Sequence, residues 1–341
     1  MDQPPPDQQQ YPTLKIAGFG DVNFSATDKP EGPRGFTLGQ LALHMASELS
    51  PRGTFFGELS FSARADAGTN SPTVTGFNTE VERMILRLDQ SDMLKLSFGR
   101  YHTPINYWNT AFHHGQWLQT SIARPEMIQF GGRLLPVHFV GALVEGSVPA
   151  SGWNVSYKAG LGNGRASVIS RGGDAGDVNG NRAWLVNLFS KPDRLYGLEF
   201  GASLYGDKLT RADTREFNER IIAAHAAWQK EDPEIIAEVA SIRHDEVGGS
   251  SATWSHAFYV QAAYRLPQFN RLWKPYYRFE HIGINAGDAV FDGVPNLDGS
   301  TLGVRYDASE FAALKGEFRT WRRGDAVPRN YGGFFQVCFT F

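Results

Sequence analysis

The feature that most restricts the fold of this chain is a two-residue alternation of apolar and polar side chains that recurs along nearly its whole length. In residues 273–283, Tyr277 and Phe279 alternate with Arg278 and Glu280. Such alternation is typical of a β-strand with one apolar and one polar face. Most of these segments are close to the roughly 9–11 residues that a tilted strand needs to cross a bilayer.

Segments of this kind predict about sixteen strands. They lie at residues 14–24, 36–49, 54–63, 79–88, 93–102, 135–148, 153–162, 181–189, 194–205, 216–228, 234–246, 254–266, 273–283, 298–306, 310–320 and 331–341. Short connections rich in Pro, Gly and Asp, which are typical of tight turns, alternate with longer polar ones. An up-and-down barrel with one rim of turns and one rim of loops produces this alternation. We therefore predict an all-β fold, a closed antiparallel transmembrane β-barrel of about 16 strands.

Residues 215–246 leave an alternative open. They are rich in Ala, Glu and Ile, and their helix propensity is compatible with two helices, which would lower the count to about fourteen strands. Pro233 at a turn position, and the alternation that includes Ile222 and Trp228, favour a hairpin instead.

The composition argues against several other classes of protein. No stretch approaches the roughly 18 consecutive apolar residues of a membrane-spanning helix. The net charge of −3 gives no indication of a nucleic-acid partner, and the single cysteine, Cys338, rules out an intramolecular disulfide and a cysteine-based zinc site. Because the motifs G-x-S-x-G and H-E-x-x-H and a P-loop are absent, we expect no catalytic residues, no enzyme activity and no cofactor.

The two ends of the chain differ in character. The first ten residues, MDQPPPDQQQ, lack the basic region and apolar core of a signal peptide, so the chain is either cytoplasmic or a mature form with a starting Met added. We expect residues 1–13 to be a flexible periplasmic segment and residues 14–341 to form the barrel. The chain ends inside a strand, with Phe335, Phe339 and Phe341 on one face. An open strand edge in hydrocarbon leaves backbone groups unsatisfied, so we predict that the last strand pairs with the first.

Three features together resemble the outer-membrane porins of Gram-negative bacteria. They are the terminal strand ending in Phe341, the even strand count with both termini on the short-turn side, and the long connection 103–134 after the fifth strand. The chain looks most like the phosphate-selective (O/P-type) porin superfamily, although no run matches the arginine ladder or lysine cluster for which those porins are known.

The resemblance implies a water-filled channel in the bacterial outer membrane for the passive diffusion of small hydrophilic solutes or ions. It also implies contact with membrane lipids, recognition of the C-terminal strand by the barrel-assembly machinery, and a homotrimer as one option. Two alternatives stay open at this point: a structural or export-associated barrel that conducts little, and an outer-membrane barrel enzyme.

Parity along the strands assigns the polar side chains to the channel. The predicted pore-lining residues of the wall are Arg83, Arg87, Lys95, Glu199, Arg278, Glu280, Arg305, Lys315, Glu317 and Arg319. Both signs of charge are present, which predicts weak charge selectivity. Arg83 and Arg87 form either a basic ladder or pairs with neighbouring glutamates. Arg100 would need a β-bulge near Gly99 to face the channel.

The long connection carries too much apolar surface to remain in water. We predict that it is an inward-folded third extracellular loop that forms the constriction, although it could instead cover the mouth or contact a neighbouring subunit. Its proposed constriction residues are Trp108, His113, His114, Trp117, Arg124 and Glu126, with Arg124 as a rim charge that lines the pore. His102, His113 and His114 raise the question of a metal. Because adjacent histidines rarely share an ion without a third oriented ligand, we expect a hydrogen-bonding role and no metal site.

Overall fold

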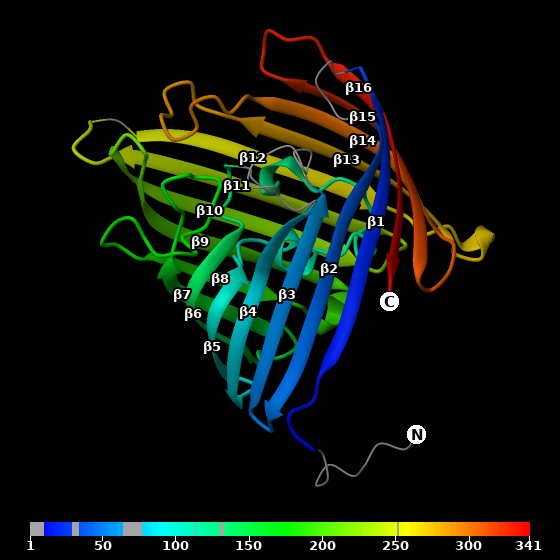
Figure 1. Cartoon of the computed structure of the whole chain (residues 1–341), viewed down its shortest axis with the longest axis horizontal. Coiled ribbons are helices and arrows are strands. Elements are labelled where there is room, and N and C mark those ends of the chain that lie inside the picture. Colours follow the sequence, from blue (N-terminus) through cyan, green and yellow to red (C-terminus); the bar gives the residue numbers. More distant parts are fainter. Residues whose placement is uncertain (1–9, 29–33, 64–76, 113, 130–132, 251) are drawn as a thin grey trace.

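The fold is a closed barrel of sixteen antiparallel strands (Figure 1). The computed structural model describes residues 10–28, 34–63, 77–112, 114–129, 133–250 and 252–341. The strands are β1 (Lys15–Thr27), β2 (Gly35–Ser50), β3 (Gly53–Ala63), β4 (Phe77–Ser91), β5 (Leu94–His102), β6 (His138–Val148), β7 (Val155–Asn163), β8 (Ala183–Ser190), β9 (Leu198–Thr210), β10 (Glu216–Gln229), β11 (Glu234–Glu246), β12 (Ala252–Ala263), β13 (Trp273–Gly283), β14 (Leu297–Asp307), β15 (Ala312–Arg323) and β16 (Asn330–Thr340).

The strand prediction is confirmed, and so is the hairpin at residues 215–246. Strands β10 and β11 pair in one continuous register from Phe217 opposite Glu246 to Gln229 opposite Glu234, so the helical alternative is wrong. Tertiary pairing and burial of one face outweigh the local helix propensity here. The largest shift of a predicted start concerns β9, because residues Asp193–Leu195 form the short 3-10 turn η3.

The barrel closes where the first and last strands meet. Strand β1 pairs with β16 from Phe19 opposite Thr340 to Thr27 opposite Gly332. Two further backbone hydrogen bonds join Gly18 and Phe341, at 2.8 and 3.0 Å. The ring of Phe341 lies across Gly18, where an added Cβ would come within 2.2 Å of it, so a larger residue at that position would displace the ring. Residues of β16 and Phe341 therefore close the wall against β1.

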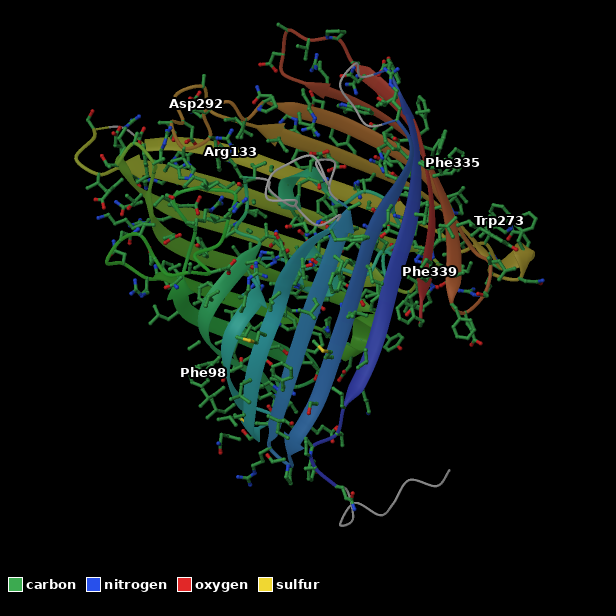
Figure 2. All side chains as sticks on the ribbon, in the orientation of Figure 1. Phe98, Arg133, Trp273, Asp292, Phe335 and Phe339 are labelled. Atoms are coloured by element: carbon green, nitrogen blue, oxygen red, sulfur yellow. The ribbon has the colours of Figure 1, made fainter. Side chains whose placement is uncertain are left out.

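The two faces of the wall differ sharply in polarity. On β13, Tyr277 and Phe279 are exposed, whereas Tyr276, Arg278 and Glu280 are buried. Figure 2 shows Phe98, Trp273, Phe335 and Phe339 on the outside of the barrel, and all four are exposed. The apolar outer side chains and the polar inner side chains of β13 are the arrangement expected of a barrel in a bilayer.

Helical structure is confined to short turns. The described residues contain one helix of four residues, α1 (Trp108–Ala111), and the 3-10 turns η2 (Glu126–Ile128), η3 (Asp193–Leu195) and η4 (Pro267–Phe269). No helix among the described residues is long and apolar enough to cross a membrane.

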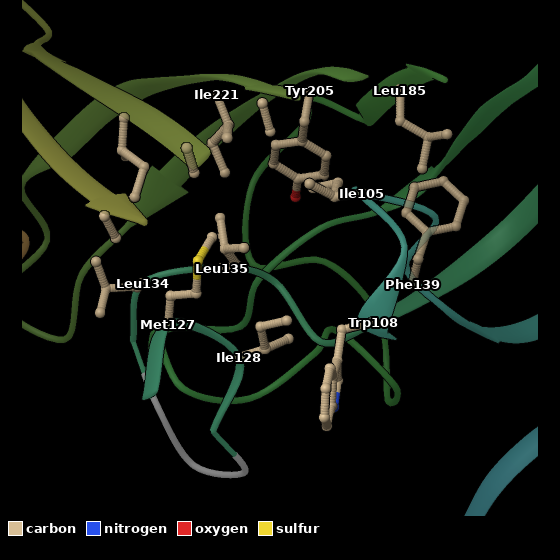
Figure 3. Packing of buried hydrophobic residues seen from close by; sticks show 14 of the residues in the cluster. Ile105, Trp108, Met127, Ile128, Leu134, Leu135, Phe139, Leu185, Tyr205 and Ile221 are labelled. Atoms are coloured by element: carbon tan, nitrogen blue, oxygen red, sulfur yellow. The ribbon is translucent and has the colours of Figure 1, made fainter. Parts of the chain in front are cut away.

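Residues 103–137, which connect β5 to β6 and are called the long segment here, hold much of the apolar core. Figure 3 shows its side chains Trp108, Met127 and Ile128 in the same cluster as Leu185 and Tyr205 of the wall. Trp108 is fully buried. Trp108, Met127 and Ile128 of the long segment therefore pack in the same core as side chains of the strands.

Candidate channel interior

The first half of the long segment is attached to the wall through backbone N–H groups. Asn106 N donates to Ser203 Oγ of β9 at 3.0 Å, and Tyr107 N donates to Glu238 Oε1 of β11 at 3.0 Å. Trp108 N donates to the same carboxylate oxygen at 2.5 Å. A buried backbone group needs a partner, and polar side chains of the wall supply it here.

The second half is bound by basic residues that were predicted to line the pore. Arg278 donates to the carbonyl oxygen of Ala123 at 2.8 Å and to that of Arg124 at 3.2 Å. Arg305 donates to the carbonyl oxygens of Trp117 and Gln119, at 2.6 and 2.9 Å. Lys315 donates to those of Gln116 and Ser121, at 2.5 and 3.1 Å.

Carboxylates of the same wall bind the N–H groups of the segment. Glu317 Oε1 accepts from Ile122 N at 2.7 Å, and Glu280 Oε2 accepts from Glu126 N at 2.5 Å. The same two residues also pair with basic neighbours two positions away: Arg278 Nε lies 2.8 Å from Glu280 Oε1, and Arg319 contacts Glu317. Strands β13 to β15 therefore use both signs of charge to hold one piece of backbone.

The charges of β3 to β7 pair with one another instead. Arg83 contacts Glu58, and Arg87 lies 2.8 Å from Asp89 and 3.7 Å from Glu145. Lys95 lies opposite Asp89 and Glu145 in the strand register. Of the two interpretations of Arg83 and Arg87, pairing with neighbouring acids describes the structure. A cavity of about 290 Å³ lies beside these charges, and its lining includes Arg83, Arg87, Tyr101, His102 and Lys158.

Two other predicted residues lie away from these sets. Glu199 on β9 is buried, with Lys191 Nζ at 3.0 Å and His225 Nε2 at 3.4 Å. Arg124 is also buried, and its Nε donates to the carbonyl oxygen of Ile128 at 3.0 Å. A buried guanidinium does not act as an exposed rim charge, so that role for Arg124 needs correction.

The remaining constriction residues are dispersed along the segment. The guanidinium carbon of Arg305 lies over the ring of Trp117, 5.6 Å from the ring centroid. Glu126 pairs with Arg323 at 2.7 Å. A second cavity of about 160 Å³ lies beside Glu126 and Arg319. His114 is buried and its Nδ1 lies 2.5 Å from Gln40 Oε1 of β2. His113 lies outside the described residues.

The structure brings together histidines and carboxylates from several strands, and two of them, Glu82 and His138, were not among the residues singled out from the sequence. We call Glu58, Glu82, His102, His114 and His138 the histidine–glutamate cluster. His138 Nε2 lies 2.9 Å from Glu82 Oε2, His114 Nε2 lies 3.2 Å from Glu82 Oε1, and His102 Nε2 lies 3.3 Å from Glu58 Oε2.

A β-bulge explains why parity missed Glu82. Opposite β3, Arg83 pairs with Glu58 and Val81 pairs with Leu59, so Glu82 is the extra residue of β4. At a bulge, one side chain points to the face opposite the one that strict alternation predicts. Glu82 is consequently buried beside Ser60, whose hydroxyl donates to Glu82 Oε1 at 2.6 Å.

For Arg100, the sequence predicts a bulge near Gly99 of β5, whereas the bulge lies in β4. Strand β5 runs past Gly99 without a register shift on either side, so the expected bulge near Gly99 is not found in these strand pairings. Arg100 instead donates to the carbonyl oxygens of Val81 and Glu82 at 2.7 and 2.6 Å. It therefore satisfies the backbone groups that the bulge in β4 leaves without ladder partners.

One ion-pair network is centred on Glu231, which lies in a turn outside the spanning strands. Glu231 follows β10, and Arg265 and Lys274 reach it from the neighbouring hairpin at 2.6 and 3.2 Å. Burial favours the neutral carboxyl, but the hydrogen bond from Arg265 and the charge of Lys274 outweigh it and lower the pKa of Glu231 to about 2.

With this geometry established, comparison with known proteins concerns the fold. No protein-family model and no curated protein sequence matches the chain. Among solved structures, an anion-selective porin from Comamonas acidovorans superposes with a TM-score of 0.69 at 13% identity, covering 97% of this chain and 100% of the porin.

Two further structures extend this likeness. The outer membrane channel DcaP of Acinetobacter baumannii gives a TM-score of 0.62 at 12% identity, covering 97% of each chain. The outer membrane protein OmpT of Vibrio cholerae, in its trimer form, gives 0.58 at 15% identity, covering 97% of this chain and 99% of that one. The chain thus has the sixteen-stranded barrel fold of outer-membrane porins. The O/P-type resemblance stays a prediction.

Proposed function

We propose that this protein is an outer-membrane porin that lets small hydrophilic solutes or ions diffuse passively through a water-filled channel. The observation that carries the proposal is the closed barrel of sixteen strands with apolar side chains outside and charged side chains inside. Barrels of about 16–18 strands are wide enough to leave an aqueous channel.

The long segment narrows this channel in our proposal. Its support is the set of hydrogen bonds from Glu238, Arg278, Arg305, Lys315 and Glu317, which are all wall residues on the face opposite the apolar one. These bonds hold the segment, chiefly its second half, against β11 to β15. We infer that the open passage runs along β3 to β7, through the cavity lined by Arg83 and Arg87 of the wall and by Pro104 and Thr110 of the segment.

Membrane insertion and assembly follow from the same fold. The apolar outer face contacts membrane lipids, and the terminal strand with Phe341 is the element that the barrel-assembly machinery would recognise. The trimeric form of one structural neighbour supports a homotrimer as the assembly state. The protein acts as a channel rather than as an enzyme in this proposal.

Conductance measurements test the proposal directly. Purified protein added to planar lipid bilayers should produce stepwise current increases of uniform size. A heat-denatured sample provides the control. Folded protein that inserts into the bilayer without conducting would instead favour the structural or export-associated barrel.

A further inference from the structure

The histidine–glutamate cluster brings potential metal ligands together from the wall and from the long segment. Glu58 lies on β3, Glu82 on β4, His102 on β5 and His138 on β6, which are four consecutive strands of the wall. His114 belongs to the long segment. Their side chains are buried except for His138, which is 11% exposed.

The separations within the cluster suit a small cation. The ligand atoms of Glu82, His102 and His138 all lie within 4.8 Å of one another, and so do those of Glu58, His102 and His114. Zinc binds imidazole nitrogen and carboxylate oxygen at about 2.0–2.2 Å, which places neighbouring donors of a tetrahedron about 3.3–3.6 Å apart. The separations of 2.9 and 3.2 Å from Glu82 to two histidines are close to that value.

The existing contacts of Glu58 and Glu82 indicate which of these two groups of three residues is the better metal site. Both groups include His102, so we expect a single metal ion to bind. Glu58 is already bound through both oxygens, by His44 at 2.8 Å and by Arg83. Glu82 accepts a hydrogen bond from Ser60 at 2.6 Å, but its contact with a guanidinium is longer, 3.4 Å to Arg100, which also binds Asp174 at 2.8 Å. Glu82 is therefore the better placed to bind an additional cation.

The ring of His114 is oriented so that one nitrogen faces the proposed metal position and the other contacts a neighbouring side chain. Its Nδ1 lies 2.5 Å from Gln40 Oε1, and its Nε2 faces Glu82. Metal-binding histidines commonly use their second nitrogen in such a hydrogen bond, which fixes the ring.

We propose that His102, His138 and Glu82, with His114 as the fourth ligand, bind one divalent transition-metal ion of the zinc type. Imidazole and carboxylate ligands suit zinc and its neighbours in the first transition row. The ion reaches the cluster from the cavity of about 290 Å³, whose lining includes His102. Because His114 lies on the long segment, the bound ion ties that segment to β4, β5 and β6.

The positive charge of a nearby arginine provides an additional test of metal binding. Arg83 contacts Glu58 of the same cluster, and like charges repel, so its positive charge should weaken the binding of a dication there. Replacing Arg83 by a neutral side chain should therefore strengthen metal binding. A cluster that serves only as a hydrogen-bonded support would gain no such affinity.

The experiment measures metal binding by the full chain, folded in detergent. Zn²⁺ is titrated by calorimetry, and Co²⁺ is added separately as a spectroscopic probe. We expect one Zn²⁺ per chain and the intense visible absorption of tetrahedral Co²⁺. His102→Gln and His138→Gln should each lower Zn²⁺ affinity at least about tenfold, and Arg83→Gln should raise it. His256→Gln, at an exposed position of β12, is the matched control and should leave it unchanged.

Two results would overturn the proposal. One is the absence of saturable Zn²⁺ binding by the wild-type protein. The other is an unchanged affinity in folded His102→Gln. If the histidine variants do not fold, the Co²⁺ spectrum of the wild-type protein decides, and weak bands of an octahedral ion count against the site.

Discussion

The walls formed by β3 to β7 and by β13 to β15 carry similar side chains but use them differently. On β13 to β15, Arg278, Arg305 and Lys315 are buried and donate to carbonyl oxygens of the long segment. On β3 to β7, Arg83 and Arg87 pair with acids of the wall itself and border a cavity. Charged residues on the inner face of this barrel therefore differ in their partners: some anchor the long segment, and others pair within the wall, beside the passage that we propose for solutes.

The largest expected effect concerns the long segment itself. Deleting residues 108–128 should raise single-channel conductance severalfold, since it removes the element proposed to fill the side next to β13 to β15. Conductance in planar bilayers is the measurement. Shortening the connection 324–329 between β15 and β16 is the control and should leave conductance near the wild-type value. A folded deletion variant with unchanged conductance would show that the segment is not the constriction.

The next effect concerns stability and distinguishes the two walls. Arg278→Met leaves Glu280 buried without its cation and removes three hydrogen bonds to the segment, so we expect a loss of about 3–5 kcal/mol in the free energy of unfolding. Arg83→Met should cost less, about 1–3 kcal/mol, because Arg83 is 22% exposed and Glu58 keeps its contact with His44.

Urea unfolding in detergent or lipid measures both losses. The double variant Arg278→Met with Glu280→Gln should regain part of the stability, since it removes the unpaired charge. Equal losses for the two single variants would contradict the distinction between an anchoring wall and a solute-facing wall.

Much of the fold could be predicted from the sequence because alternation, turn residues and strand length are local signals. The outward Tyr277 and the inward Arg278 follow directly from parity. The bulge at Glu82 is not a local signal, because it depends on how β3 and β4 pair. The hydrogen bonds from Arg305 and Lys315 to the backbone of the long segment could not be predicted either. Alternation indicates which face a side chain lies on but not which group it binds.

A smaller effect concerns ion selectivity. The wild-type channel should select weakly between anions and cations, since the wall carries both signs of charge. Arg87→Glu should shift the reversal potential toward cation preference by placing a negative charge beside the cavity. Lys230→Glu makes the same charge change at an exposed turn outside the barrel and should have little effect. A strong preference in the wild-type protein, or no shift in Arg87→Glu, would contradict the placement of the passage.

The smallest effect concerns Glu231, which lies in the turn after β10 and pairs with Arg265 and Lys274. The pKa of Glu231 is lowered to about 2 from the usual 4.5, because the hydrogen bond from Arg265 and the charge of Lys274 outweigh burial. A carboxyl with a lowered folded-state pKa stabilises the protein fully above the unfolded-state value and loses that contribution as the pH falls from 4.5 toward 2. Because the Glu231 side chain is 43% exposed, solvent screens the pair, and we expect less than about 1 kcal/mol. Glu231→Gln should therefore lower the urea midpoint at pH 6, and the difference from the wild-type protein should vanish near pH 2. Conductance should not change, and a constant difference at all pH values would show that the ionised carboxylate is not the source of the stability.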